Sequence, residues 1–201
     1  MNFRTLVFVS ALLAPVSAFC QLPISLGIKG GGALTDAFSD RSATVGGVTT
    51  RTYSPQGDYI VGPMLELHLP MGISAEVDAL YRPLHLRTEF ASTAGSFSGP
   101  GTVNSWEFPI LAKYHFGIPF VKPFIEAGPS FRHVSQFAGD TPHLSTNGLA
   151  LGAGVEAKAL FVRIAPEFRY THWGTDSNRG TSPFTPSSNP NQVEFLIGIS
   201  F

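Results

Sequence analysis

The chain ends on QVEFLIGISF, residues 192–201, and this stretch indicates how the rest of the chain folds. Large apolar side chains occupy every second position, at Val193, Phe195, Ile197, Ile199 and Phe201. The residues between them are small or polar, with one exception, Leu196. Such alternation predicts a β-strand with an apolar face, because successive side chains of a strand point to opposite sides. Since the last residues of a soluble domain are usually poorly ordered, an aromatic terminus predicts that something buries or binds it.

The composition also favours strands over helices. The 201 residues match a single domain, and they include 17 Phe, 21 Gly and 16 Pro but only 13% charged residues. Gly and Pro interrupt regular structure, and aromatic side chains suit the surface of a sheet. The 13 Lys and Arg nearly balance the 14 Asp and Glu, so the sequence predicts no surface for nucleic acid.

The first residues have the layout of a secretory signal peptide. Arg4 precedes an apolar run over 6–16, and small residues follow. We predict a signal peptide over 1–20, cleaved after residue 18 or after residue 20, and one mature domain over 21–201. The apolar run is too short for a membrane-spanning helix, and no other segment is long enough for one. Cys20 is the only cysteine, which excludes an intramolecular disulfide.

Eight segments of alternating apolar and polar residues are each long enough to cross a bilayer at a tilt. They are 24–34, 58–69, 73–88, 103–116, 120–134, 148–157, 160–173 and 192–201. Tight turns at 69–72, 116–119 and 157–160 alternate with long polar loops at 35–57, 89–102, 135–147 and 174–191. This asymmetry is typical of outer-membrane barrels. The sequence therefore predicts an all-β fold, an eight-stranded antiparallel up-and-down transmembrane β-barrel with both termini on the side of the short turns.

Nearly all charges inside these segments share one parity, and they predict a network of ion pairs in the barrel lumen. A soluble lipocalin-like barrel would instead turn the apolar face inward. The interior of an eight-stranded barrel would be overfilled by the roughly forty apolar side chains of this chain, so we favour the membrane barrel. Buried charges must be paired with one another. The predicted lumen charges are Lys29, Glu66, Glu76, Asp78, Arg82, Glu107, Lys113, Lys122, Glu126, Arg132, Glu156, Lys158, Arg163, Glu167, Arg169 and Glu194.

Several stretches resemble the outer membrane protein β-barrel domain family of small bacterial barrels. They are SLGIKGGGALTDAF, EFPILAKYHFGIPFVKPFIEAGPSF, APEFRYTHW and NQVEFLIGISF. The resemblance covers about the whole mature chain, and it implies a location among the lipids of the bacterial outer membrane. The last strand also resembles the β-signal that the barrel-assembly machinery recognises in its clients. That resemblance implies an assembly signal at Val193, Phe195, Ile197, Ile199 and Phe201.

Two features could suggest a bound ligand. GIKGGGA, residues 27–33, lacks the Gly-Lys-Ser/Thr ending of a phosphate loop, and no helix pattern follows it. We interpret its glycines as positions that let a crowded barrel strand bend or approach side chains in the lumen. The six histidines are scattered without the spacing of metal ligands, so we expect neither a metal nor a cofactor.

One segment, RYTHWGTDSNRG at 169–180, is a candidate active site. It resembles the His-x-Ser-Asn run of lipid A 3-O-deacylases, which are also eight-stranded outer-membrane barrels. In that case His172 would activate Ser177 toward an acyl ester, and a carboxylate would orient the imidazole. Three extra residues separate His172 from Ser177 in this chain, so we favour a polar extracellular loop.

We therefore expect a monomeric, non-catalytic barrel with a closed, ion-paired lumen and a structural or surface-interaction role. Extracellular partners would contact the loops at 35–57 and 174–191. Two alternatives are the deacylase and a narrow channel for small solutes. The channel would need gaps in the lumen network, and small lumen residues such as Gly27, Gly152 and Gly154 would provide them.

Overall fold

The computed structural model describes residues 23–39, 41–53, 57–92, 95–117, 121–134, 145–159, 161–174 and 187–201. The predicted signal peptide and both of its cleavage positions lie outside these ranges, as does Ser177. No helix within the described ranges is long and apolar enough to cross a membrane.

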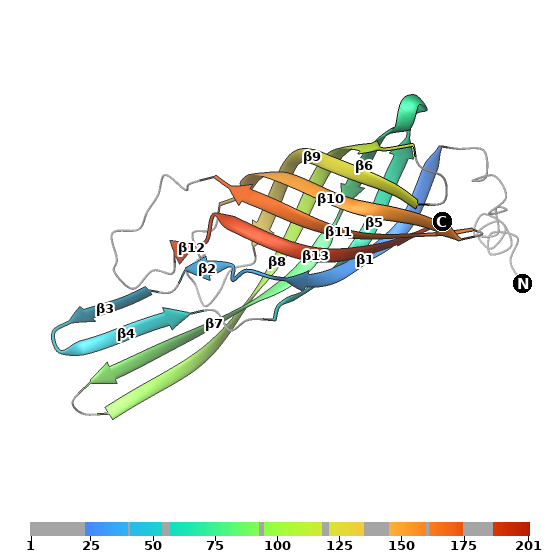
Figure 1. The fold of residues 1–201 in the computed structure, drawn as a ribbon. Coiled ribbons are helices and arrows are strands. Elements are labelled where there is room, and N and C mark those ends of the chain that lie inside the picture. Colours follow the sequence, from blue (N-terminus) through green and yellow to red (C-terminus); the bar gives the residue numbers. More distant parts are fainter. Residues whose placement is uncertain are drawn as a thin grey trace, which may run out of the picture.

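Strands make up most of the described chain (Figure 1). They are β1 (Ile24–Ala33), β2 (Phe38–Ser39), β3 (Arg41–Val45), β4 (Val48–Tyr53), β5 (Tyr59–His68), β6 (Ile73–Asp78), β7 (Leu80–Ser92), β8 (Gly95–His115), β9 (Val121–Val134), β10 (Asn147–Ala159), β11 (Val162–Trp173), β12 (Ser187–Ser188) and β13 (Asn191–Ser200). A short 3-10 turn, η2 (Pro70–Gly72), joins β5 to β6.

The barrel closes through antiparallel pairs between neighbouring strands. Their order is β1-β13-β11-β10-β9-β8-β6-β5, and β5 pairs with β1 to complete the ring. β6 and β7 together form one wall strand, because only Ala79 separates them and their register onto β8 is continuous. The predicted eight-stranded antiparallel barrel is confirmed. As expected, QVEFLIGISF is the closing strand, with Ser200 opposite Gly27 and Glu194 opposite Ala33.

One end of the barrel, which we call the turn end, contains the start of β1, the end of β13 and η2 (Figure 1). The tight turn predicted at 69–72 is confirmed, and positive φ angles at Met71 and Gly72 reverse the chain there. The turn predicted at 157–160 lies further along the chain, because β10 continues to Ala159, which pairs with Val162. Residues 118–120 of the turn predicted at 116–119 lie outside the described ranges.

The prediction of loops is wrong for two stretches, because both form strands. The stretch 35–57 contains β2, β3 and β4, and the stretch 89–102 belongs to the long hairpin of β7 and β8. β3 pairs with β4 and β4 with β7, so β3, β4 and the outer parts of β7 and β8 form a projecting sheet beyond the barrel (Figure 1). The end of the stretch 174–191 also contains β12, which pairs with β2. Residues 135–144 of the remaining predicted loop are not described.

The barrel wall is apolar outside and polar inside. Exposed large apolar residues come from all eight wall strands and include Ile28, Val61, Val77, Ile110, Ile125, Leu151, Phe168 and Ile197. The closing strand illustrates the alternation, since Glu194 is buried whereas Ile197 is 40% exposed. An apolar outer wall around a charged interior is the arrangement of a membrane barrel and the opposite of a soluble lipocalin-like barrel.

The glycine run of β1 allows this strand to lie close to β13. A Cβ atom at Gly31 would lie 1.9 Å from the carbonyl oxygen of Phe195, and one at Gly27 would lie 2.2 Å from that of Ile199. Side chains at these two positions would force the strands apart, so glycine is required for the close approach. The geometry agrees with the interpretation of GIKGGGA as a crowded strand.

Candidate functional site

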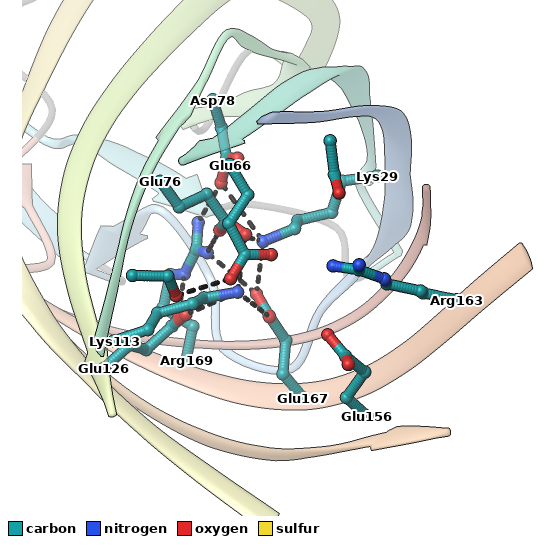
Figure 2. Close-up of polar contacts among 12 residues, drawn as sticks. Lys29, Glu66, Glu76, Asp78, Lys113, Glu126, Glu156, Arg163, Glu167 and Arg169 are labelled. Atoms are coloured by element: carbon teal, nitrogen blue, oxygen red, sulfur yellow. Dashed lines mark hydrogen bonds and ion pairs between the residues drawn. The ribbon is translucent and has the colours of Figure 1, made fainter. Parts of the chain in front are cut away.

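A cluster of seven charged side chains lies inside the barrel (Figure 2). We call it the central cluster, and its members are Lys29, Lys113, Arg169, Glu76, Asp78, Glu126 and Glu167. All seven side chains are buried, and they come from β1, β6, β8, β9 and β11. The alternation of side chains along each strand points all seven inward, so the cluster connects strands that are far apart in the sequence.

The two lysines of the central cluster contact opposite oxygens of Glu76. Lys29 Nζ lies 2.5 Å from one oxygen of Glu76 and 3.0 Å from Glu167. Lys113 Nζ lies 2.5 Å from the other oxygen of Glu76 and 3.4 Å from Glu126. Such short charge-assisted contacts are needed here, because burial removes the water that would otherwise stabilise each ion.

Arg169 contacts all four carboxylates of the central cluster. Its Nε donates to Glu126 at 3.0 Å, and its Nη1 donates to Asp78 at 2.9 Å. Its Nη2 donates to Glu167 at 2.8 Å and to Glu76 at 3.4 Å. A planar guanidinium with five fixed donors suits this arrangement better than an ammonium group would.

Three carboxylates of the central cluster have the spacing of possible metal ligands. Oxygen atoms of Glu76, Glu126 and Glu167 lie within 4.8 Å of one another. Each of these groups also contacts Arg169 and at least one of the two lysines. The chain itself therefore supplies the positive charge that three clustered carboxylates require.

A second layer of buried polar groups lies between the central cluster and the projecting sheet. It consists of Asp58, Arg82, Glu107, Arg132, Gln192 and Glu194. Arg132 donates to Gln192 Oε1 at 2.6 Å, and its guanidinium carbon lies 3.6 Å from the centre of the Trp173 ring. Arg82 donates to the same Gln192 oxygen at 3.1 Å and lies 3.3 Å from Glu194. Ion pairs and a cation–π contact thus connect side chains across the lumen at this level too.

The remaining predicted lumen charges lie at the turn end. Glu66 is buried there and accepts a hydrogen bond from Ser74 at 2.5 Å, and Glu156 is also buried. Arg163 is half-buried, whereas Lys122 and Lys158 are exposed. Figure 2 shows Arg163 and Glu156 apart from the central cluster. Parity grouped all these charges in one network, but the structure distributes them over three levels.

Two histidines belong to the turn-end level, although their spacing in the sequence carried no signal of it. The rings of His68 and His115 lie 6.5 Å apart. His68 contacts the hydroxyl of Ser25 at 2.9 Å and also contacts Arg163, and His115 lies 3.7 Å from Glu156. Inward parity at strand ends was the available signal, and only the closed ring places these strand ends together.

His172 of the candidate active site lies on the outer wall of the barrel and is exposed. Its Nδ1 lies 2.8 Å from Asn191 Oδ1 and 3.5 Å from the hydroxyl of Tyr170. Among the described residues, an amide and a phenol contact the ring, and no carboxylate does. Ser177 lies outside the described ranges, so the described half of the site lacks the acid that orients the base of a triad.

The chain is similar to known barrels. A family model described as outer membrane protein beta-barrel domain matches residues 17–134. The crystal structure of neisserial surface protein A (NspA) is 14% identical, with a TM-score of 0.54 over 89% of this chain and 96% of that chain. The outer membrane protein OprG from Pseudomonas aeruginosa is 15% identical, with a TM-score of 0.53 over 89% of this chain and 94% of that chain. At these identities the likeness concerns the fold alone. No curated protein sequence matches the chain.

Proposed function

Because this chain belongs to the outer membrane protein beta-barrel domain family, we propose that it is a monomeric, non-catalytic barrel of the bacterial outer membrane with a closed lumen. Its role is structural, and its projecting sheet interacts with partners outside the cell. The observation that supports the closed lumen best is the central cluster, whose seven buried charges bond across the barrel.

Opening the lumen would require breaking several ion pairs at once. Every member of the central cluster contacts at least two groups of opposite charge. Removing one partner of a buried ion pair costs about 3–5 kcal/mol because the other charge is left unpaired, and separating the side chains to admit solute would likewise leave charges unpaired. In the second layer of buried polar groups, the contact between Arg132 and Trp173 also obstructs the lumen.

The projecting sheet supports the surface-interaction part of the proposal. Exposed apolar side chains stand out on it, at Val45, Val48, Phe90 and Phe97, and Phe97 is 70% exposed. Exposed apolar groups on an otherwise polar surface are typical of interaction sites. Ring closure leaves the barrel wall without a free strand edge, which favours a monomer within the membrane.

The assembly role of the last strand also remains a proposal. Val193, Phe195, Ile197, Ile199 and Phe201 share the outward parity of β13. They are therefore accessible from the lipid side at the barrel seam between β13 and β1. This placement suits recognition by the barrel-assembly machinery while the barrel is still open.

Planar-bilayer recording of the refolded protein tests the closed lumen. We expect no steady conductance, since the central cluster blocks the path. Outer-membrane fractionation and heat-modifiable migration on a gel provide the control that the protein has inserted and folded. Steady single-channel conductance from protein that passes this control would replace the closed barrel with the narrow channel.

Mass spectrometry of lipid A from cells that produce the protein tests the absence of catalysis. We expect the acyl chains of lipid A to be the same with and without the protein, because His172 contacts an amide instead of a carboxylate. Loss of an acyl chain that disappears in both His172→Ala and Ser177→Ala would establish the deacylase instead.

A further inference from the structure

We propose that the turn end of the barrel binds a phosphate group. A cavity of about 300 Å³ opens there, and we call it the mouth cavity. Its charged and titratable lining residues are His68, His115, Lys122, Glu156, Lys158 and Arg163. Two of these lining residues, Glu156 and Arg163, lie apart from the central cluster in Figure 2.

Strand geometry brings the three fixed cations of the mouth cavity together. Lys122 is the second residue of β9, whereas Lys158 and Arg163 lie on either side of the turn between β10 and β11. Lys122 and Arg163 each lie four residues from a buried carboxylate on the same strand, and Lys158 lies two residues from one. An even separation along a strand puts side chains on the same face, so each cation points inward like its carboxylate. All three therefore face the same opening, and none of them faces lipid.

The pairing of β10 with β11 places two of these cations in an unfavourable position. Lys158 and Arg163 are direct cross-strand partners. Like charges directly opposite each other destabilise a sheet. A bound anion between these two side chains would convert the repulsion into attraction.

The carboxylates at this level face Lys122 and the two histidines instead of Lys158 and Arg163. Glu156 is the cross-strand partner of Lys122 and lies 3.7 Å from His115. Glu66 lies deeper, 3.7 Å from His68 and 3.8 Å from His115. Within the described ranges, no carboxylate lies at ion-pair distance from Lys158 or Arg163. The contrast with the central cluster, in which every cation contacts at least three carboxylates, indicates a site that an external anion completes.

Phosphate is the anion whose chemistry fits best. Its several oxygens accept hydrogen bonds from a guanidinium fork and from an ammonium group together, and the neighbouring imidazoles add further donors. The rim of the cavity also includes Leu69 and Ile73, which are exposed and apolar. The phosphate of a lipid headgroup could enter the cavity while its acyl chain packs against this rim, and a free phosphate shares the same recognition chemistry.

Binding to the refolded full chain in a maltoside detergent tests the proposal, because that detergent contains no phosphate. The two probes are inorganic phosphate and a short-chain phosphatidylglycerol. The binding of each probe is measured by isothermal titration calorimetry and by broadening of the ³¹P resonance. Lys158→Gln removes one exposed ammonium group, and Arg163→Gln removes the guanidinium. We expect each variant to bind at least about tenfold more weakly, since each loses a charge-assisted hydrogen bond.

Arg87→Gln is the matched control, because Arg87 is exposed on the distant projecting sheet and its loss changes the net charge equally. Heat-modifiable migration shows whether each variant folds, and the exposed Lys158→Gln keeps the test valid if Arg163→Gln does not. Binding of both probes supports a general phosphate site, and binding of phosphatidylglycerol alone supports a lipid headgroup. Binding of neither probe, or equal binding by Lys158→Gln and the unmodified chain, would overturn the proposal. None of these outcomes depends on whether the lumen is closed to solutes.

Discussion

Replacing Arg169 by methionine removes the one side chain that contacts every carboxylate of the central cluster. Methionine keeps much of the side-chain length but no charge. The guanidinium contacts at 2.8 Å to Glu167, 2.9 Å to Asp78 and 3.0 Å to Glu126 are lost. Three cations against four carboxylates become two against four, so the net charge of the buried cluster changes from −1 to −2.

The size of the effect follows from which contacts remain. A hydrogen bond to a charged group contributes about 1.5–3 kcal/mol, but the lost contacts do not simply add. Lys29 still contacts Asp78 at 3.3 Å, and Lys113 still contacts Glu126 at 3.4 Å. We therefore expect Arg169→Met to lower the free energy of unfolding by about 3–5 kcal/mol, which is typical when one partner of a buried ion pair is removed.

Denaturant unfolding in lipid vesicles, followed by tryptophan fluorescence, measures this loss. Arg87→Met is the control, because Arg87 is exposed on the projecting sheet and should change stability by no more than about 0.5 kcal/mol. Adding Glu167→Gln to Arg169→Met returns the cluster to a net charge of −1 and should recover part of the loss. A loss below about 1 kcal/mol in Arg169→Met, or no recovery in the double variant, would refute the account of the cluster as a tightly coupled network.

Three further predictions concern the barrel wall and its last strand. Gly31→Val should impair barrel closure, because its side chain would collide with β13, whereas Gly30→Val should be tolerated, since a Cβ there lies 3.7 Å from its nearest neighbour; heat-modifiable migration compares them. Leu151→Arg puts a charge on the lipid face and should cost about 2–4 kcal/mol in vesicle unfolding. Val45→Arg, at a similarly exposed apolar position of the projecting sheet, should cost little. Deletion of Phe201 should reduce the amount of folded barrel in outer-membrane fractions more than any single loop substitution, and normal assembly would show that β13 ends as an ordinary strand.

The sequence alone determined the direction in which most wall side chains point. A strand has a side-chain period of two, so the outward position of Ile197 and the inward position of Glu194 follow from parity without any knowledge of neighbouring strands. The same rule placed Lys29, Glu76 and Arg169 in the lumen. Gly and Pro marked the turns predicted at 69–72 and 116–119. Ring closure between the first and last strands followed from the number and spacing of the eight segments.

The partners of the lumen charges were decided only by the tertiary structure. Arg169 is the cross-strand partner of Glu194, yet its guanidinium contacts Asp78 and Glu126, which lie on other strands of the ring. Parity also could not separate the central cluster from the mouth cavity. The height of a side chain in the lumen depends on strand tilt and on the stagger between neighbours, which no single strand encodes.

The projecting sheet is a second feature that the sequence alone did not predict. The stretches 35–57 and 89–102 contain only scattered apolar residues, such as Val45, Phe90 and Phe97, so neither has the continuous apolar face that indicates a strand. They become strands because the barrel sets β4 beside β7, where Thr50 pairs with Phe90 and backbone groups bond across the gap. Local alternation determined the faces of this protein, and only the closed ring decided its contacts, because hydrogen bonds and ion pairs form between segments that the fold has first brought together.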